Sequence, residues 1–181
     1  MQLHNEVCIS ANGQKVTVRA LWDTGATMSA ISHSVAEDLK LVPIGKQIVA
    51  TPTGSKEVDT FCVDTMLPNN VNFEGIIVID SEIGSQTAGG EPIGMLVGMD
   101  IIGRGDFAVT NHNGRTIFTY RCPSVGSIDF VNQLVMKNKI GTPHGKGNGK
   151  RKAKKDKTPK HPHLAERLSG GVFAFRREIQ L

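Results

Sequence analysis

Two Asn-Gly dipeptides, Asn12-Gly13 and Asn113-Gly114, constrain the fold of this chain more than any other sequence feature. Each lies between two short runs rich in β-branched or aromatic residues, at 7–9 and 16–18 for the first and at 107–110 and 116–120 for the second. Asn-Gly favours the positive φ angles of a tight type I′ turn, so each stretch predicts an antiparallel hairpin. Further short apolar runs and 20 glycines favour a closed all-β domain with one or two short helices.

Apolar periodicity predicts the other elements of this domain. In chain order they are a helix within 29–41 capped by Ser29 or Ser32 and stopped by Pro43, strands at 47–50, 57–64 and 71–80, a loop over 81–94, and a strand that ends at Gly98. Asp100 is then expected to cap a short helix that ends at Gly103 or Gly105.

Charge divides the chain into two regions. Residues 1–136 hold 8 Lys and Arg against 14 Asp and Glu, whereas 137–181 hold 13 against 3. We therefore expect a folded domain at 1–130 and a basic, largely disordered tail at 131–181. The basic 137–160 segment is either a solvated run or a weak, nonspecific contact for nucleic acid. The apolar end of the chain, 171–181, either docks as a terminal strand or stays loose.

Several classes of protein are disfavoured by what the sequence lacks. The three cysteines are too widely spaced for a disulfide framework or a metal-ligand pair, so we expect a reducing compartment and no metal. No basic start with a long apolar run marks a secretion signal, and no apolar run reaches the length of a membrane span. The glycine-rich loop at 81–94 lacks the Gly-Lys-Ser/Thr ending of a phosphate-binding loop. These features predict a soluble, cytoplasmic protein without a cofactor.

Three short stretches carry the functional signal. Asp23-Thr24-Gly25 follows an apolar strand, the 47–64 hairpin is tipped near Gly54, and Leu96-Val97-Gly98 ends a later strand. Taken singly they are a common turn, a surface hairpin and a buried strand end. In this order, over residues 5–122, they resemble the retropepsin-like aspartic proteases, specifically the small single-lobe forms found outside retroviruses.

The resemblance implies an aspartic endopeptidase in a retropepsin-like barrel, and it assigns roles around the first stretch. Asp23 would be the catalytic carboxylate, and Thr24 would lock two such turns together across a dimer. Gly25 would let the backbone approach the carboxylate, and Thr27 would support Asp23 from behind.

The same resemblance assigns the other two stretches. Thr53, Gly54 and Ser55 would form the tip of a mobile flap over the substrate. Leu96, Val97 and Gly98 would pack beneath the active-site turn.

The number of Asp-Thr/Ser-Gly triplets sets the expected assembly. A peptide bond is hydrolysed in this family by water held between two carboxyls that share one proton, so each site needs two such triplets. The chain has one, because Asp59-Thr60, Asp64-Thr65 and Asp80-Ser81 are not followed by glycine. We therefore expect a two-fold homodimer that acts on a protein or peptide. The alternative is a catalytically weak module of the same fold that dimerises and binds peptides, with a tail that binds polyanions.

Overall fold

The computed structural model of the 181-residue chain describes residues 2–51, 54–133 and 173–180. They fall into two units, and the described residues through Val125 together with 173–180 form the first. Its strands are β1 (His4–Ala11), β2 (Gln14–Trp22), β3 (Ala30–Ser32), β4 (Gly45–Thr51), β5 (Gly54–Met66), β6 (Asn72–Ser81), β7 (Thr87–Ala88), β8 (Glu91–Val97), β9 (Asp106–His112), β10 (Arg115–Cys122) and β11 (Phe173–Gln180). Its helices are α1 (His33–Asp38), the 3-10 turn η1 (Glu82–Ser85) and α2 (Met99–Ile102).

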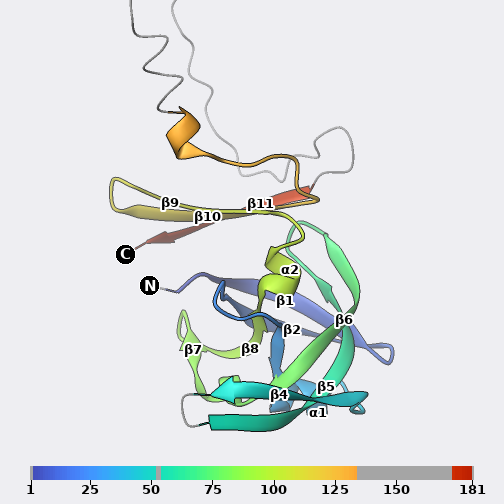
Figure 1. Ribbon diagram of the computed structural model, residues 1–181. Helices are drawn as coiled ribbons and strands as arrows, with labels where there is room; N and C mark the ends of the chain where they lie inside the picture. Colours follow the sequence, from blue (N-terminus) through green and yellow to red (C-terminus); the bar gives the residue numbers. More distant parts are fainter. Residues whose placement is uncertain (1, 52–53, 134–172, 181) are drawn as a thin grey trace, which may run out of the picture. The chain divides into compact units, whose positions relative to one another are not determined.

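The larger sheet of this unit has the strand order β1-β2-β8-β3-β6-β5-β4 (Figure 1). β1 also pairs with β5 through Cys8 to Ser10, so the path of hydrogen-bonded strands returns to its start. The pairs β2–β8 and β3–β6 are parallel, whereas the hairpins are antiparallel. The predicted all-β class with a few short helices is therefore confirmed.

Both Asn-Gly hairpins are confirmed. Asn12 and Gly13 have φ angles of 52° and 75° between β1 and β2, and Asn113 and Gly114 repeat these angles between β9 and β10. The positive φ at both central residues is the type I′ geometry, which strains most other residues.

A second sheet of three strands has the order β11-β10-β9. β11 pairs with β10 in an antiparallel register that runs from Arg115–Gln180 to Cys122–Phe173. Of the two alternatives for the end of the chain, the structure therefore shows a docked terminal strand. Residues 134–172, including the basic 137–160 segment, lie outside the described residues.

The predicted helix within 29–41 is shorter than expected, because its first residues form a strand instead. Ala30, Ile31 and Ser32 are buried between β6 and β8 and make β3. Ser32, one of the two predicted caps, accepts a 3.4 Å hydrogen bond from the Val35 N–H and starts α1. The helix ends at Asp38, well before Pro43, so the predicted stop at that proline is wrong.

The 81–94 segment is more ordered than the predicted loop. It contains η1 and β7 and the start of β8. The Gln86 N–H donates a hydrogen bond to the Ile83 carbonyl, and the Ile93 N–H donates one to the Gln86 carbonyl. Glycines Gly89 and Gly90 adopt positive φ and reverse the chain between β7 and β8. A glycine-rich segment can thus hold short paired elements that periodicity alone does not reveal.

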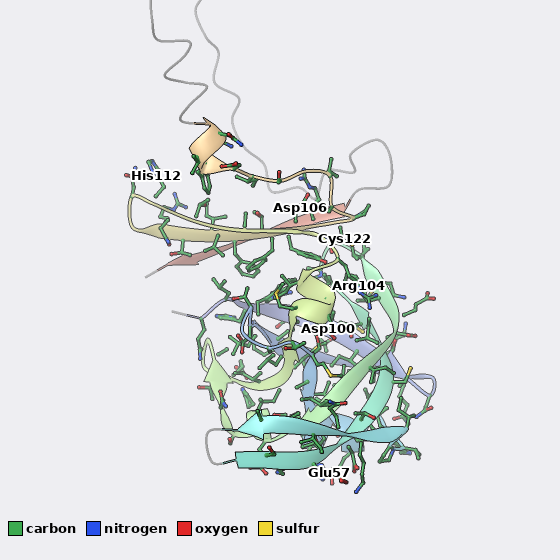
Figure 2. All side chains as sticks on the ribbon, viewed as in Figure 1. Glu57, Asp100, Arg104, Asp106, His112 and Cys122 are labelled. Atoms are coloured by element: carbon green, nitrogen blue, oxygen red, sulfur yellow. The ribbon has the colours of Figure 1, made fainter. Side chains whose placement is uncertain are left out.

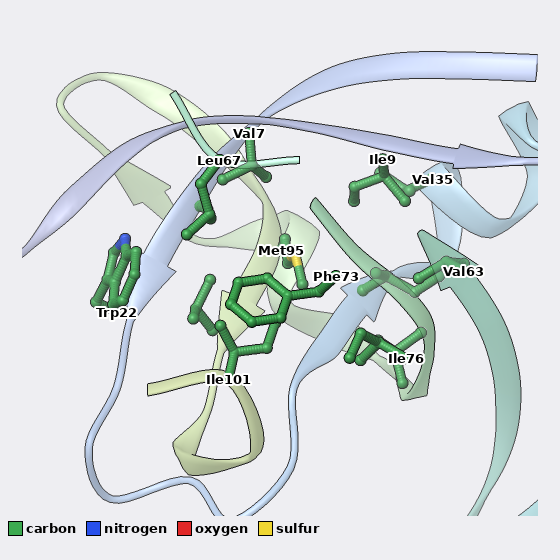
Figure 3. Close-up of a cluster of buried hydrophobic side chains, with 14 of the residues drawn as sticks. Val7, Ile9, Trp22, Val35, Val63, Leu67, Phe73, Ile76, Met95 and Ile101 are labelled. Carbon is green, nitrogen blue, oxygen red and sulfur yellow. The ribbon is translucent and has the colours of Figure 1, made fainter. Parts of the chain in front are cut away.

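The main hydrophobic core is one cluster of buried side chains, part of which is drawn in Figure 3. Trp22, Phe73, Met95 and Ile101 reach it from β2, β6, β8 and α2. Phe118 and Tyr120 of β10 belong to the same buried cluster, so the second sheet contributes to this core.

Within the second unit, the described residues 126–133 contain one helical turn that begins at Phe130. The Asp129 carboxylate caps it by accepting the N–H groups of Val131 at 2.9 Å and Asn132 at 3.1 Å. Among the helices in the described parts of the chain, none is long and apolar enough to cross a membrane.

Candidate active site

The Asp23 turn begins where β2 ends. The backbone N–H of Asp23 donates to the Val97 carbonyl at 3.0 Å, which ties the turn to the end of β8. The Gly25 N–H donates to Asp23 Oδ1 at 2.8 Å and fixes the carboxylate. A Cβ at Gly25 would lie 3.1 Å from the same oxygen, so glycine leaves room for this close approach. Asp23 is partly buried while Thr24 and Gly25 are exposed, so the turn is open to solvent.

A set of hydrogen bonds holds the chain after Asp23 against the start of α2. The Met99 N–H donates to the Ala26 carbonyl at 2.8 Å, and the Asp100 N–H donates to the Thr27 carbonyl at 3.2 Å. These bonds fix two residues of the turn directly to the helix. The position of Asp23 is therefore set by β8 on one side of the turn and by α2 on the other.

Ser29 completes this connection, and we call Ser29, Gly98 and Asp100 the latch. The Ser29 hydroxyl donates to Asp100 Oδ1 at 2.7 Å and accepts from the Gly98 N–H at 3.0 Å. Ser29 is fully buried, and the Asp100 carboxylate lies on α2 in Figure 2. The serine thereby satisfies a buried amide and a carboxylate together.

Gly98 lies so close to the turn that no side chain fits there. A Cβ at this position would be 2.6 Å from the Met28 carbonyl carbon and 3.0 Å from the Ala26 oxygen. Both neighbours are backbone atoms, so neither can move without moving the turn. The same glycine is the N-cap of α2, where Asp100 was expected, so that predicted cap is wrong.

Trp22, the residue before the Asp23 turn, packs against aromatic side chains of the second sheet. Its ring stacks on Phe107 with centroids 5.5 Å apart and lies 5.1 Å from the Tyr120 ring. The Trp22 indole N–H donates to the Asn5 side-chain oxygen. The Tyr120 hydroxyl in turn donates to the Ile101 carbonyl of α2 at 2.8 Å. The base of the turn is therefore braced by β9, β10 and α2.

Comparison with known proteins identifies this arrangement. Residues 6–101, more than half of the chain, match the family model described as aspartyl protease, and the match includes Asp23 and Gly98. The chain belongs to the aspartyl protease family. The predicted resemblance is thus confirmed, and the comparison with curated proteins found no match to this sequence.

Solved structures of viral and bacterial proteases are similar to this chain. EIAV protease in complex with the inhibitor HBY-793 is 18% identical, with 57% of this chain and 86% of that chain covered and a TM-score of 0.42. A retropepsin-like aspartic protease from Rickettsia conorii is 18% identical, with 59% and 76% covered and a TM-score of 0.40. The Simian Foamy Virus (mac) protease is 20% identical, with 55% and 92% covered and a TM-score of 0.36.

The structure brings together two of the three stretches singled out in the sequence. The segment from Asp23 to Ser29 is hydrogen-bonded to the end of β8, since Asp23 donates to the Val97 carbonyl and the Ser29 hydroxyl accepts from the Gly98 N–H. Leu96 pairs with Leu21 of β2 and Ala30 of β3 on either side. The hydrogen bonds of Thr27 that are seen here involve its backbone.

The third stretch lies on the β4–β5 hairpin. Gly54 pairs with Thr51 and Ser55 pairs with Ala50, which confirms the hairpin itself. Both residues line a hollow of about 450 Å³ whose lining does not include Asp23. Thr53 lies outside the described residues.

The sequence predicted Ser29 and Asp100 to be helix caps, whereas the structure pairs them with each other in the latch. Ser29 has apolar neighbours in Met28, Ala30 and Ile31, and a hydroxyl that is buried must find a hydrogen-bond partner. That signal predicts a partner but does not identify it, because Asp100 is 71 residues away.

Among the residues that the structure describes, no group of three or more His, Cys, Asp or Glu side chains could hold a metal ion. Cys8, Cys62 and Cys122 are free thiols.

Proposed function

We propose that the chain is an aspartic endopeptidase whose active site forms when two copies bring their Asp23 carboxylates together. The observation that carries the proposal is the single Asp23-Thr24-Gly25 turn, held rigidly at its base and exposed at its tip. One carboxylate cannot serve as acid and base at once in the water-mediated mechanism of the family. A second copy supplies the missing group without any further element of the chain.

The chemistry follows from two carboxyls that share one proton. The ionised carboxyl takes a proton from a water molecule as the water oxygen attacks the peptide carbonyl carbon. The protonated carboxyl gives its proton to the carbonyl oxygen, which forms a tetrahedral diol. Collapse of the diol breaks the C–N bond, and the proton taken from water passes to the leaving amine. The pair regains its single proton when a hydroxyl of the diol reverts to a carbonyl.

The rest of the turn supports this role. Gly25 holds one oxygen of Asp23 by its N–H, which leaves the other oxygen for water or for the partner carboxyl. We assign Thr24, exposed at the tip, to the contact between the two turns, and Thr27 to support behind Asp23. Gly54 and Ser55 stay our candidates for the flap, together with Thr53.

The direct test is peptide hydrolysis by the Asp23→Asn protein, which keeps the shape of the side chain and removes its charge. We expect the variant to remain folded and dimeric, by circular dichroism and sedimentation, and to lose hydrolysis of a peptide library followed by mass spectrometry. A variant that cuts peptides as fast as the parent would show that Asp23 is not the catalytic group.

A further inference from the structure

We propose that two copies of this chain meet along the outer edge of β9, where the two β9 strands pair with each other across a two-fold axis at Val109. This inference rests on the proposed function, which it deepens by naming the surface that brings the two Asp23 carboxylates together. β9 is an edge strand, because it pairs with β10 on one side and no described strand pairs with its other side.

The hairpin that joins β9 to β10 determines which backbone groups point to this edge. The residues that flank a two-residue turn exchange hydrogen bonds, and here they are His112 and Arg115. The alternation of an antiparallel ladder then directs the N–H and C=O groups of Asn111, Val109 and Phe107 away from β10. No hydrogen bond to another described segment occupies these groups.

These outward groups are complementary to their own copies. When two β9 strands run antiparallel about an axis at Val109, Val109 lies opposite its own copy, and Phe107 lies opposite Asn111 of the other chain. All three residues turn their N–H and C=O groups toward the second strand, so every opposed pair can exchange hydrogen bonds. A two-fold contact of this kind needs only one surface, which both copies supply.

β9 lacks the features that keep edge strands from pairing with other chains. Natural edge strands carry lysine, proline or inward-pointing charges that discourage such pairing. Residues 107–111 are Phe, Ala, Val, Thr and Asn, and so contain no charge and no proline. The edge strand β4 contains Lys46, and the edge strand β11 contains Arg176 and Arg177. Pairing of β9 with its copy therefore brings no like charges together over these residues.

The burial of apolar side chains also stops short at this edge. Val109 is 38% exposed, although it lies directly opposite Phe118, which is fully buried on β10. Residues directly opposite in an antiparallel pair share one face of the sheet, so Val109 continues a buried face and is left uncovered at its margin. The side chain of a second Val109 would cover this apolar surface.

The position of β9 beside the Asp23 turn argues for a second copy as the partner. The Phe107 ring of β9 stacks on Trp22 with centroids 5.5 Å apart, and Trp22 is the residue before Asp23. Two Asp23 carboxyls can share one proton only if the two-fold axis passes beside this turn. An element close to a two-fold axis is also close to its own copy, so pairing of the Asp23 turns brings the two β9 edges toward each other.

The first experiment measures dimer formation by sedimentation equilibrium, with full-length protein that carries Asp23→Asn to prevent self-digestion. Val109→Pro removes one outward N–H from each copy, and proline is tolerated at such edge positions. We expect the dimer dissociation constant to rise by at least about tenfold. Ile48→Pro is the matched control, because Ile48 lies on the edge strand β4 and, like Val109, is three residues before the pair that closes its hairpin. The control should leave the constant unchanged, and an unchanged constant in a folded Val109→Pro protein would overturn the proposal.

A charge-swap experiment keeps the proposal testable if the proline variant does not fold. Val109→Lys and Val109→Glu each place like charges opposite each other across the axis, so we expect each protein alone to dimerise at least about tenfold more weakly. An equimolar mixture of the two should restore the dimer, because opposite charges then face each other. Thr110→Lys and Thr110→Glu are the controls, since Thr110 lies on the other face of β9 and would oppose Ala108. A mixture that dimerises no better than either Val109 variant alone would show that Val109 does not face its copy.

The β9 contact and the shared active site fail in different ways. A wild-type chain that cuts peptides while it stays monomeric at every concentration tested would refute the shared site, and the β9 pairing with it. A wild-type chain that dimerises no more tightly than its folded Val109 variants would refute the β9 contact alone, and the shared Asp23 site would stand.

Discussion

Substitution of Ser29 by alanine tests how firmly the Asp23 turn is held. The change removes one hydroxyl from a fully buried position and leaves the backbone unaltered. Two hydrogen bonds disappear with it, one to Asp100 Oδ1 at 2.7 Å and one from the Gly98 N–H at 3.0 Å. The Gly98 amide then lies buried without its partner, while Asp100 keeps the Ile101 N–H at 3.1 Å.

The expected loss of stability follows from these two bonds. A buried donor left unpaired costs about 1–3 kcal/mol, and a hydrogen bond to a charged group contributes about 1.5–3 kcal/mol. Asp100 is only partly buried, so water replaces part of its lost bond. The two contributions share one hydroxyl and do not add fully, so we expect the free energy of unfolding to fall by about 2–4 kcal/mol.

Urea unfolding in the Asp23→Asn background measures this difference without self-digestion. All variants are compared at one protein concentration, because dimer formation contributes to the apparent stability. Ser85→Ala is the control, since Ser85 is exposed and makes a single 3.0 Å bond to the Glu82 carbonyl. We expect that control to change the stability by less than about 0.5 kcal/mol.

The account of the latch would be refuted by a Ser29→Ala protein whose stability matches that of Ser85→Ala. A double-mutant cycle with Asp100→Ala adds a finer check. Residues that share a hydrogen bond give a coupling energy of about 0.5–3 kcal/mol, whereas independent residues give nearly none. Additive effects would show that Ser29 and Asp100 do not act together.

Two further substitutions test the close packing at Gly98 and the hydrogen bonds of Asp106. Gly98→Ala places a Cβ 2.6 Å from the Met28 carbonyl carbon, so we expect the free energy of unfolding to fall by about 1–3 kcal/mol and peptide hydrolysis to slow. Gly126→Ala is the control, because a Cβ at Gly126 has nothing within 4 Å, and it should change neither the stability nor the rate. Equal behaviour of the two alanine variants would contradict the close approach. Hydrogen bonds from Ser124, Val125 and Arg121 hold the pKa of Asp106 well below its ordinary value. Its ionised form therefore stabilises the fold above the unfolded-state pKa of about 4, and this contribution fades as the pH falls toward the folded-state value. Asp106→Asn should lower the melting temperature at neutral pH by more than it does below about pH 4, and a difference independent of pH would refute this.

The sequence predicted the elements whose signals are local. Asn12-Gly13 and Asn113-Gly114 specify their turns through backbone φ angles, so both hairpins form as expected. Trp22 ends the strand that leads to Asp23. The position of Asp23 at a strand end could therefore be predicted from its neighbours in the sequence alone. The order of these local signals was sufficient to indicate the family.

The parts that depend on tertiary pairing were not predictable in this way. Residues 30–32 carry a helical pattern, yet they pair with β6 and β8 and form a strand, because burial between two neighbours outweighs local preference. The Ser29–Asp100 bond joins residues 71 positions apart, and nothing near either residue indicates the other.

The central claim is that Asp23 works only with its copy from a second chain, and subunit mixing tests it most directly. Wild-type protein is mixed with an equal amount of Asp23→Asn protein, allowed to exchange subunits, and assayed for peptide hydrolysis. If each site needs two Asp23 carboxylates, about one quarter of the dimers remain competent, and the activity falls to about half that of the same wild-type protein left unmixed. Activity that stays at the unmixed value would show that each chain carries a complete site, which would contradict the shared dyad.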